Sequence, residues 1–184
     1  MKNCNIAILG ATGAVGREML NVLEEYDIPV SRLRLLSSAR SAGSKIPFRG
    51  EDLTVEEATY ASFEGMDFVL GAVKSGMSRA FAPAIVKSGA VYIDNSSAFR
   101  MDPAIPLVVP EINADHIRII DAQRKRLGTK RGFIAVKSNC SLQSYVPAIH
   151  PLMDLGVTKV LACTYQAISG AGKTFETYPD ILDN

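Results

Sequence analysis

Short apolar runs alternate with stretches of helical periodicity along most of the chain. Apolar runs rich in β-branched residues predict strands, and apolar residues spaced three and four positions apart predict helices. The predicted strands are residues 5–9, 33–36, 53–55, 67–73, 90–93, 107–109, 133–136 and 157–167, and the predicted helices are residues 13–26, 78–87, 113–126 and 140–155. This alternation predicts an α/β fold with a mostly parallel sheet and helices on both faces.

The pattern changes after about residue 138, and we place a domain boundary there. Residues 139–184 contain one predicted helix, one predicted strand and a loop, which is too little to form a core. We therefore expect two parts, residues 1–138 and the incomplete start of a second domain, and interpret the chain as the front part of a longer protein. Within the first part, Asn113 is a candidate N-cap and Pro83 a candidate helix kink.

Composition and charge narrow the class of protein. Hydrophobic residues make up 47% of the 184 residues, which excludes a disordered chain. The net charge of +1 argues against a nucleic-acid binder, so we interpret the basic stretch Arg124–Arg131 as a solvated helix end. Three cysteines without paired spacing indicate a reducing compartment, the cytoplasm. No apolar run approaches the roughly 20 residues that span a bilayer.

A glycine-rich loop, Gly10–Gly16, joins the first predicted strand to the first predicted helix. Glycines are needed where a turn is tight and where backbone approaches a pyrophosphate. The helix N-terminus then offers free N–H groups and a positive dipole end to the phosphates. Because a strand precedes and a helix follows the loop, we interpret it as a dinucleotide-binding loop of a Rossmann-like domain. A tight turn without a ligand is the alternative.

The end of the second predicted strand bears on which dinucleotide binds. An NAD site places a carboxylate there for the ribose 2′-hydroxyl. This chain has Ser37–Ser41 (SSARS) instead. Hydroxyls and the Arg40 guanidinium suit a 2′-phosphate, so the sequence favours NADP over NAD. A solvated loop arginine is the alternative.

Cys140 opens a predicted helix directly after Asn139, a good N-cap. The helix dipole there favours the thiolate, which covalent catalysis at an acyl carbon requires. From position alone an inert buried cysteine is the stronger alternative. His150, ten residues further on, would lie about 15 Å away along one helix. We expect His116 to be solvated, so neither histidine is a good base partner.

Other candidates are weaker from position alone. Cys4 and Cys163 lie in predicted strands and are expected to be structural. Arg100 ends the stretch after the strand at residues 90–93, where parallel sheets bind ligands, and could hold an anion. A surface salt bridge is the preferred alternative for Arg100. Residues 169–172 form a small-residue loop that permits close approach of a ligand.

Six segments together resemble aspartate-semialdehyde dehydrogenase, in family order and over nearly the whole chain. The segments are Gly10–Gly16 (GATGAVG), Ser37–Gly43 (SSARSAG), Asp94–Arg100 (DNSSAFR), Val109–Asn113 (VPEIN), Ser138–Ser141 (SNCS) and Tyr165–Gly172 (YQAISGAG). The chain departs from the family pattern at Ser138, where the family commonly has proline, and at Val73–Gly76 (VKSG), where it often has Phe-Ser-Ala-Gly.

The resemblance implies a Rossmann-like NADP-binding domain over residues 1–138 and the start of an α+β catalytic and dimerisation domain over residues 139–184. It implies that Cys140 attacks the acyl carbon of β-aspartyl phosphate and forms a thioester, which NADPH reduces to aspartate semialdehyde. Arg100 would bind phosphate, and Asn139 and Gln166 would position the substrate. The implied cofactor-binding residues are Gly10, Thr12, Gly13, Ala14, Val15, Ser38, Arg40, Ser41, Ser169 and Gly170.

The resemblance also implies amino-acid biosynthesis, a small-molecule substrate with phosphate, a homo-oligomer at full length, and no metal, membrane or nucleic-acid partner. The remaining substrate residues and the base would lie beyond residue 184. An N-acetyl-glutamyl-phosphate reductase is one alternative, although its cysteine context is usually Gly-Cys-Tyr. A non-catalytic NADP-binding module is the other.

Overall fold

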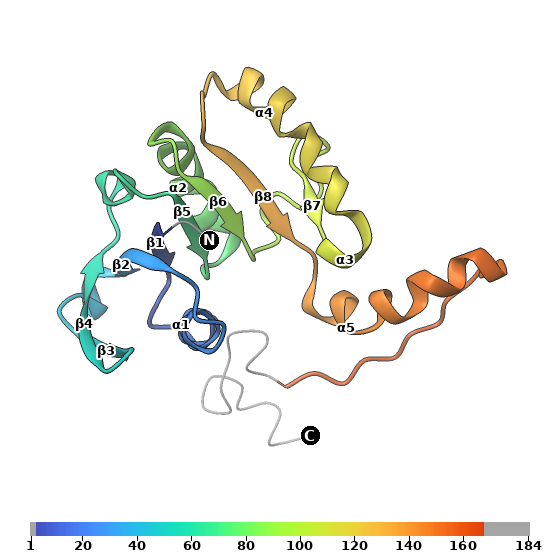
Figure 1. Ribbon diagram of the computed structural model, residues 1–184, viewed down its shortest axis with the longest axis horizontal. Helices are drawn as coiled ribbons and strands as arrows, with labels where there is room; N and C mark the ends of the chain where they lie inside the picture. Colours follow the sequence, from blue (N-terminus) through green and yellow to red (C-terminus); the bar gives the residue numbers. More distant parts are fainter. Residues whose placement is uncertain (1–2, 168–184) are drawn as a thin grey trace.

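A computed structural model describes residues 3–167 as one sheet with helices on both faces (Figure 1). Its eight strands run in the order β3-β4-β2-β1-β5-β6-β8-β7, and every pair is parallel except β3–β4. The predicted α/β fold is therefore confirmed. The strands are β1 (Cys4–Leu9), β2 (Val30–Ser37), β3 (Lys45–Phe48), β4 (Glu51–Glu57), β5 (Phe68–Gly71), β6 (Val91–Asp94), β7 (Leu107–Val108) and β8 (Phe133–Lys137).

Helices α1 (Ala14–Glu25) and α2 (Ser75–Lys87) cover opposite faces of the sheet. In β1 the side chain of Ile8 packs with α1, and that of Leu9 packs on the α2 side. Successive strand residues point to opposite faces, so a central strand must be apolar throughout. The other helical segments are α3 (Pro110–Asn113), α4 (Ile120–Leu127), α5 (Cys140–Ile149), η1 (Ala39–Ser41), η2 (Tyr60–Phe63), η3 (Ala114–Ile119) and η4 (His150–Leu155).

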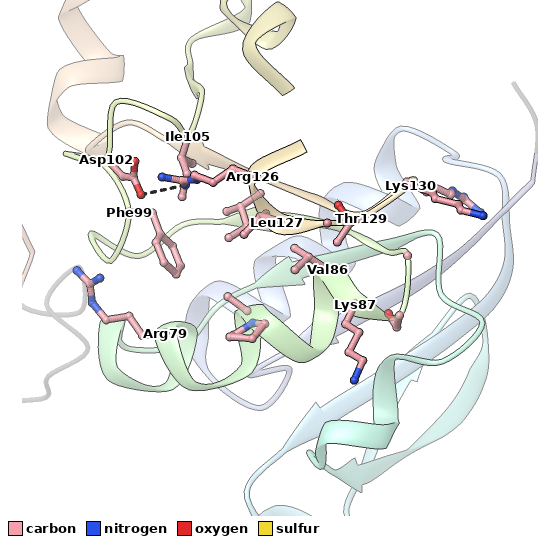
Figure 2. A pocket seen from close by; sticks show the side chains of 17 residues that line it. Arg79, Val86, Lys87, Phe99, Asp102, Ile105, Arg126, Leu127, Thr129 and Lys130 are labelled. Atoms are coloured by element: carbon pink, nitrogen blue, oxygen red, sulfur yellow. Dashed lines mark hydrogen bonds and ion pairs between the residues drawn. The ribbon is translucent and has the colours of Figure 1, made fainter. Parts of the chain in front are cut away.

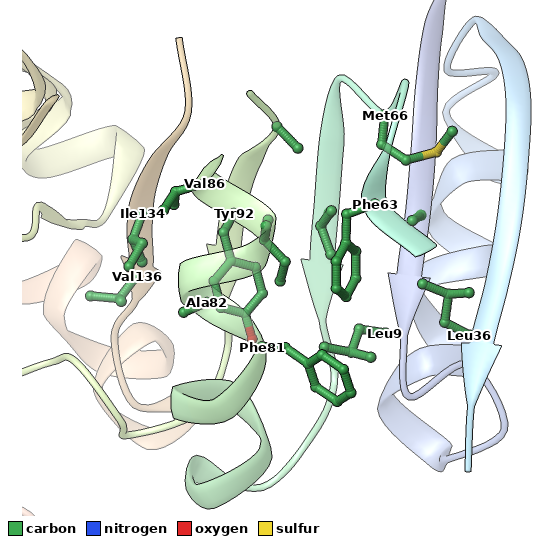
Figure 3. Close-up of a cluster of buried hydrophobic side chains, with 14 of the residues drawn as sticks. Leu9, Leu36, Phe63, Met66, Phe81, Ala82, Val86, Tyr92, Ile134 and Val136 are labelled. Atoms are coloured by element: carbon green, nitrogen blue, oxygen red, sulfur yellow. The ribbon is translucent and has the colours of Figure 1, made fainter. Parts of the chain in front are cut away.

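The larger core cluster lies between α2 and the sheet (Figure 3). Phe63 and Phe81 meet edge to face with their ring centroids 5.6 Å apart. Tyr92 is fully buried, and its hydroxyl donates to Ser78 Oγ at 2.9 Å. A Cβ at Gly71 would lie 2.6 Å from the Tyr92 hydroxyl, so this glycine makes room for the ring.

No strand was predicted in the polar stretch that follows β2, but the structure has strand β3 there. Residues Lys45–Phe48 pair with β4 in an antiparallel hairpin. Its turn residues Arg49 and Gly50 both have positive φ, +50° and +82°, as a tight two-residue hairpin turn requires. Pro47 argues against a strand in the sequence, because proline lacks a backbone N–H. Strand β3 lies at the edge of the sheet, where proline is tolerated.

The single helix predicted over residues 113–126 is instead three segments, α3, η3 and α4. Asn113 stands at the N-cap position of η3, but its side chain makes no capping hydrogen bond. Its Oδ1 accepts from Val109 N–H at 2.7 Å, and its Nδ2 donates to Leu107 O at 2.9 Å. The side chain therefore ties α3 back to β7 and is not available to a helix N-terminus.

The strand predicted over residues 157–167 does not form, because no neighbouring strand pairs with this part of the described chain. Its apolar side chains are exposed, Leu161 at 91% and Tyr165 at 100%. Cys163 is likewise exposed, so the expectation of a structural cysteine in a strand is wrong. Among residues 3–167 no helix has the length and apolarity to cross a bilayer.

Candidate functional site

Four predicted site segments lie at one edge of the sheet, the edge where the parallel strands end. They follow β1, β2, β6 and β8, and the segment after β5 lies at the same edge, because these five strands are neighbours in the sheet. Ligands of open α/β sheets bind outside the carboxyl ends of the strands. The topology therefore brings together residues that lie up to about 130 positions apart in the chain.

The loop after β1 uses its glycines in different ways. Gly10 has φ +93°, and a Cβ there would lie 2.5 Å from Ala72 O. A Cβ at Gly16 would lie 2.3 Å from Gly10 O, so Gly16 lets α1 pack against the strand end. A Cβ at Gly13 would meet only Gly10 O at 3.5 Å. Gly13 is the N-cap of α1 and supplies no side-chain cap, which leaves the first-turn N–H groups open to a ligand.

A cavity of about 440 Å³ opens beside this loop. Of the predicted cofactor-binding residues among the described ones, Gly10, Thr12, Gly13 and Ser38 line this cavity, whereas Ala14, Val15, Arg40 and Ser41 do not. Sequence reasoning missed other lining residues, because they follow different strands. Among these are Glu57, Ala72, Lys74 and Met77.

The end of β2 carries hydroxyl side chains and is followed by an arginine. Thr12 Oγ1 and Ser37 Oγ are 2.7 Å apart, so a hydroxyl pair stands where an NAD site would have a carboxylate. Arg40 is exposed in η1 and makes no hydrogen bond or ion pair with any other described residue. Its guanidinium is therefore available to an anion. Glu57 also lines the cavity, and its carboxylate would repel such an anion.

Cys140 is the first residue of α5 and is exposed. Asn139 caps the helix as predicted, because its Oδ1 accepts from Ser141 N–H at 2.9 Å. The Nε2 atom of Gln166 lies 3.9 Å from Cys140 Sγ and also donates to Ser141 Oγ. The structure thus brings Gln166 to the cysteine from 26 residues away, which the sequence indicated only through the resemblance.

Two backbone carbonyl groups orient the side chain of Arg100. Its Nε donates to Lys137 O at 3.0 Å and its Nη2 donates to Asn95 O at 2.7 Å. The preferred alternative, a surface salt bridge, is wrong, because Arg100 pairs with no carboxylate among the described residues. The loop that carries Arg100 is shaped by buried Asp94, which accepts from both Ser96 N–H and Ser96 Oγ.

Lys137 was missed by sequence reasoning, since a lysine at a strand end carries no motif. Its Nζ donates to Ser138 O at 3.1 Å and to Gln143 Oε1 at 3.3 Å. Partial burial lowers the pKa of Lys137, and the Arg100 charge lowers it further. The proximity of Cys140 opposes this drop in the Lys137 pKa.

The remaining predicted positions fall elsewhere. His116 is not simply solvated, because its Nδ1 lies 3.1 Å from Leu107 O. His150 is exposed at the start of η4. Ser169 and Gly170 lie outside the described residues. Within residues 3–167 no group of acidic, histidine or cysteine side chains is arranged to hold a metal ion.

A second cavity, of about 710 Å³, lies between the C-terminal ends of α2 and α4 (Figure 2). The basic stretch Arg124–Arg131 borders it, but several of its charges are paired within the molecule. Arg126 pairs with Asp102 at 3.4 Å, and Arg131 pairs with Asp67. The basic stretch therefore lies at a helix end, as interpreted, but Arg126 and Arg131 form ion pairs and are not simply solvated.

The fold and the glycine loop define a class of protein, a Rossmann-like NAD(P)-binding domain. Residues 5–120 match the family described as "Semialdehyde dehydrogenase, NAD binding domain". The chain therefore belongs to the semialdehyde dehydrogenase family.

Known proteins similar to the chain agree with this assignment. The aspartate-semialdehyde dehydrogenase of Bacillus subtilis (strain 168) is 47% identical over 173 residues, which cover 93% of this chain and 46% of that protein. The structure of aspartate semialdehyde dehydrogenase II from Vibrio cholerae, complexed with ASA, is 37% identical with a TM-score of 0.72 and covers 83% of this chain and 47% of that one.

A further similar structure was solved with a cofactor bound. Aspartate semialdehyde dehydrogenase with NADP from Candida albicans is 28% identical, with a TM-score of 0.71, and covers 82% of this chain and 47% of that one. The chain thus spans about half the length of the relatives that it matches.

Proposed function

We propose that this chain provides the NADP site and the nucleophile of an NADPH-dependent enzyme that reduces β-aspartyl phosphate to aspartate semialdehyde. The observation that carries the proposal is the contact of Gln166 Nε2 with Cys140 Sγ at 3.9 Å. Arg100, which is held by the carbonyl of Lys137, lies at the same edge of the sheet, where the strands end. The Gly10–Gly16 loop and the similarity to aspartate-semialdehyde dehydrogenases support the same reaction.

In the first step, the Cys140 thiolate attacks the acyl carbon. A C–S bond forms, the bond between the acyl carbon and the phosphate oxygen breaks, and inorganic phosphate leaves. Cys140 lies in the first turn of α5, at the positive end of the helix dipole, which favours the thiolate. Arg100, which has no carboxylate partner among residues 3–167, would bind the phosphoryl group that carries the developing negative charge.

In the second step, the thioester is reduced. The nicotinamide, when bound, supplies a hydride to the thioester carbon. Gln166, whose Nε2 reaches the cysteine sulfur, would hold the acyl group in place. The C–S bond then breaks, aspartate semialdehyde is released, and Cys140 returns to its thiolate form.

NADP fits the residues at the end of β2. The open N-terminus of α1 would bind the pyrophosphate, and Ser38, Arg40 and Ser41 would surround the 2′-phosphate. Cytoplasmic location, a role in amino-acid biosynthesis and homo-oligomerisation at full length belong to the same proposal. The domain boundary near residue 138 is also proposed, since β8 ends there and α5 begins.

The test of the nucleophile is the substitution Cys140→Ser. In the complete enzyme, we expect turnover of aspartate semialdehyde with NADP and phosphate to fall roughly a thousandfold or more, because a hydroxyl is a far weaker nucleophile than a thiolate. NADPH binding, measured by titration calorimetry, should be unchanged. Cys163→Ser, at the other exposed cysteine, is the control. Undiminished turnover in the Cys140 variant would contradict the thioester mechanism.

The test of the cofactor is a calorimetric titration with NADPH and with NADH. We expect NADPH to bind more tightly, and Arg40→Ala to weaken NADPH binding about tenfold while NADH binding is unchanged, since a charge-assisted hydrogen bond is worth roughly 1.5–3 kcal/mol. Arg118→Ala, at an exposed arginine of η3, is the matched control. Equal weakening of both cofactors would show that Arg40 does not contact the 2′-phosphate.

A further inference from the structure

The cavity between α2 and α4 lies near the starts of β6 and β8 (Figure 2). Three segments far apart in the chain form its walls, namely the second half of α2, the loop after β6, and the connection from α4 to β8. The connection lies close against α2, because a Cβ at Gly132 would collide with the Val86 carbonyl. The volume of about 710 Å³ lies within the range of small-molecule pockets, roughly 300–1,000 Å³.

The interior of this cavity is apolar. Val86 of α2 and Ile134 of β8 line it and are almost fully buried, at 4% and 5% exposed. The Phe99 ring, from the loop after β6, and the Leu127 side chain, at the end of α4, also line it. Leu127 is 39% exposed, so an apolar group that entered the cavity would remove hydrophobic surface from water, which is favourable.

Basic side chains surround this apolar interior. Five basic residues line the cavity, whereas Asp102 is the single acidic one among its described lining residues. Asp102 pairs with Arg126, and Arg131 pairs with Asp67. The other three basic side chains are exposed and have no carboxylate partner among residues 3–167; they are Arg79, Lys87 and Lys130. In Figure 2 Arg79 lies at one end of the cavity and Lys130 at the other.

The ends of the two helices do not cancel this positive charge. A helix C-terminus carries a partial negative charge, and the last turns of α2 and α4 contain Lys87 and Arg126, which offset it. The carbonyl oxygen of Val86 in the last turn of α2 already accepts from Gly89 N–H at 3.1 Å. The cavity therefore has an excess of cations that the protein itself leaves without anions.

Arg79 joins the charged rim to the apolar interior. Its Cζ atom lies 5.4 Å from the centroid of the Phe99 ring, so the guanidinium stacks beside the apolar lining. The guanidinium donates no hydrogen bond to any other residue in the described part of the chain. Its fork of N–H groups matches a carboxylate, and a carboxylate bound there would leave the rest of the molecule beside Phe99.

We propose that this cavity binds a small organic acid with an apolar body. Arg79 binds the carboxylate, Lys87 and Lys130 add positive potential, and Phe99, Val86 and Leu127 contact the apolar body. The inference goes beyond the proposed function and does not depend on it. Because Phe99 directly precedes Arg100, the bound acid contacts the loop that carries the proposed phosphate-binding arginine.

The experiment is a titration of the full chain with phenylbutyrate, followed by proton–nitrogen correlation spectra. We expect saturable shifts at the amides of the lining residues Ile105, Leu127 and Thr129. Butyrate, which lacks the ring, should bind at least tenfold more weakly, because it buries less apolar surface. Phenylbutylamine should also bind at least tenfold more weakly, because it has the same ring and the opposite charge.

Arg79→Gln should weaken phenylbutyrate binding about tenfold, because it removes a charge-assisted hydrogen bond. Arg118→Gln, at an exposed arginine of η3, is the matched control and should leave binding unchanged. Equal affinities of these two variants would overturn the proposal, and so would equal binding of the acid and the amine.

The location of binding is tested by the same spectra. Shifts at Thr12 and Gly13 in place of the cavity residues would mean that the acid binds at the glycine loop, and would overturn the proposal. The absence of saturation below about 10 mM, as expected of a surface that contacts another protein segment, would overturn it too. None of these measurements uses NADP or substrate, so their failure is distinct from failure of the proposed reaction, which Cys140→Ser tests.

Discussion

At the residue scale, the glycines of one motif differ in what a side chain would meet. Gly13 is open toward the cavity, whereas Gly16 faces backbone. The motif therefore combines a ligand requirement with a packing requirement, and substitution can separate them. Gly76, in the first turn of α2, offers a comparison, because a Cβ there would meet no atom within 4 Å.

We expect Gly16→Ala to lower the free energy of unfolding by about 3 kcal/mol, because the Cβ would lie 2.3 Å from Gly10 O and the backbone would have to shift. Gly76→Ala should raise it by roughly 0.5 kcal/mol, the helix-propensity gain of alanine. Urea unfolding of both variants measures the difference. Equal stability of the two variants would show that α1 does not pack so closely on β1.

At the scale of elements, a side chain substitutes for a missing strand partner along β8. Strand β7 pairs with β8 only near its end, at Val136 and Lys137. Closer to the start of β8, fully buried Gln123 of α4 accepts from Ile134 N–H at 2.7 Å and donates to Ile134 O at 3.0 Å. The side-chain amide of Gln123 thus supplies hydrogen-bond partners to backbone groups of β8 that would otherwise be buried without any.

We expect Gln123→Leu to lower the free energy of unfolding by about 3 kcal/mol, because it leaves a buried N–H and C=O unpaired. Hydrogen exchange at the Ile134 amide should accelerate by at least tenfold. Lys125→Ala, on the exposed side of α4, is the control and should change neither quantity. Unchanged exchange at Ile134 would mean that the amide does not cap this edge.

At the scale of the molecule, one carboxylate connects segments at the starts of strands, at the edge of the sheet opposite the candidate functional site. Asp67 accepts from Asn5 N–H at 2.8 Å and pairs with Arg131. The backbone hydrogen bond and then the arginine lower the pKa of Asp67. Arg126 and a backbone N–H act in the same direction on the pKa of Asp102, and Arg34 does so on that of Glu56.

Because the folded-state pKa of Asp67 is lowered, its stabilising effect is complete above the unfolded pKa of about 3.9 and is lost as the pH falls through the folded value. We therefore expect Asp67→Asn to flatten the dependence of unfolding free energy on pH below about 4. Exposed Asp115→Asn makes the same charge change and is the control. Denaturant titrations between about pH 2 and pH 6 measure the slopes, and identical slopes would exclude this role.

Many of the local elements were predictable because their signals are short-range. The strand before Gly10, the helix after Gly13 and the cap at Asn139 each follow from a few adjacent residues. Residues 157–167 show the limit of such signals: their β-branched composition predicts a strand, but a strand also needs a neighbour.

Only the tertiary structure decided which distant residues share the site. Arg100 is oriented in part by the carbonyl of Lys137, and the cavity beside the glycine loop includes Glu57 of β4 and Lys74 at the N-cap of α2. These contacts depend on strand order, which places the ends of β1, β2, β5, β6 and β8 side by side. The sequence by itself determined the elements and the chemical groups, because their signals are local; the packing of the sheet determined which groups meet, because that depends on contacts between residues far apart in the chain.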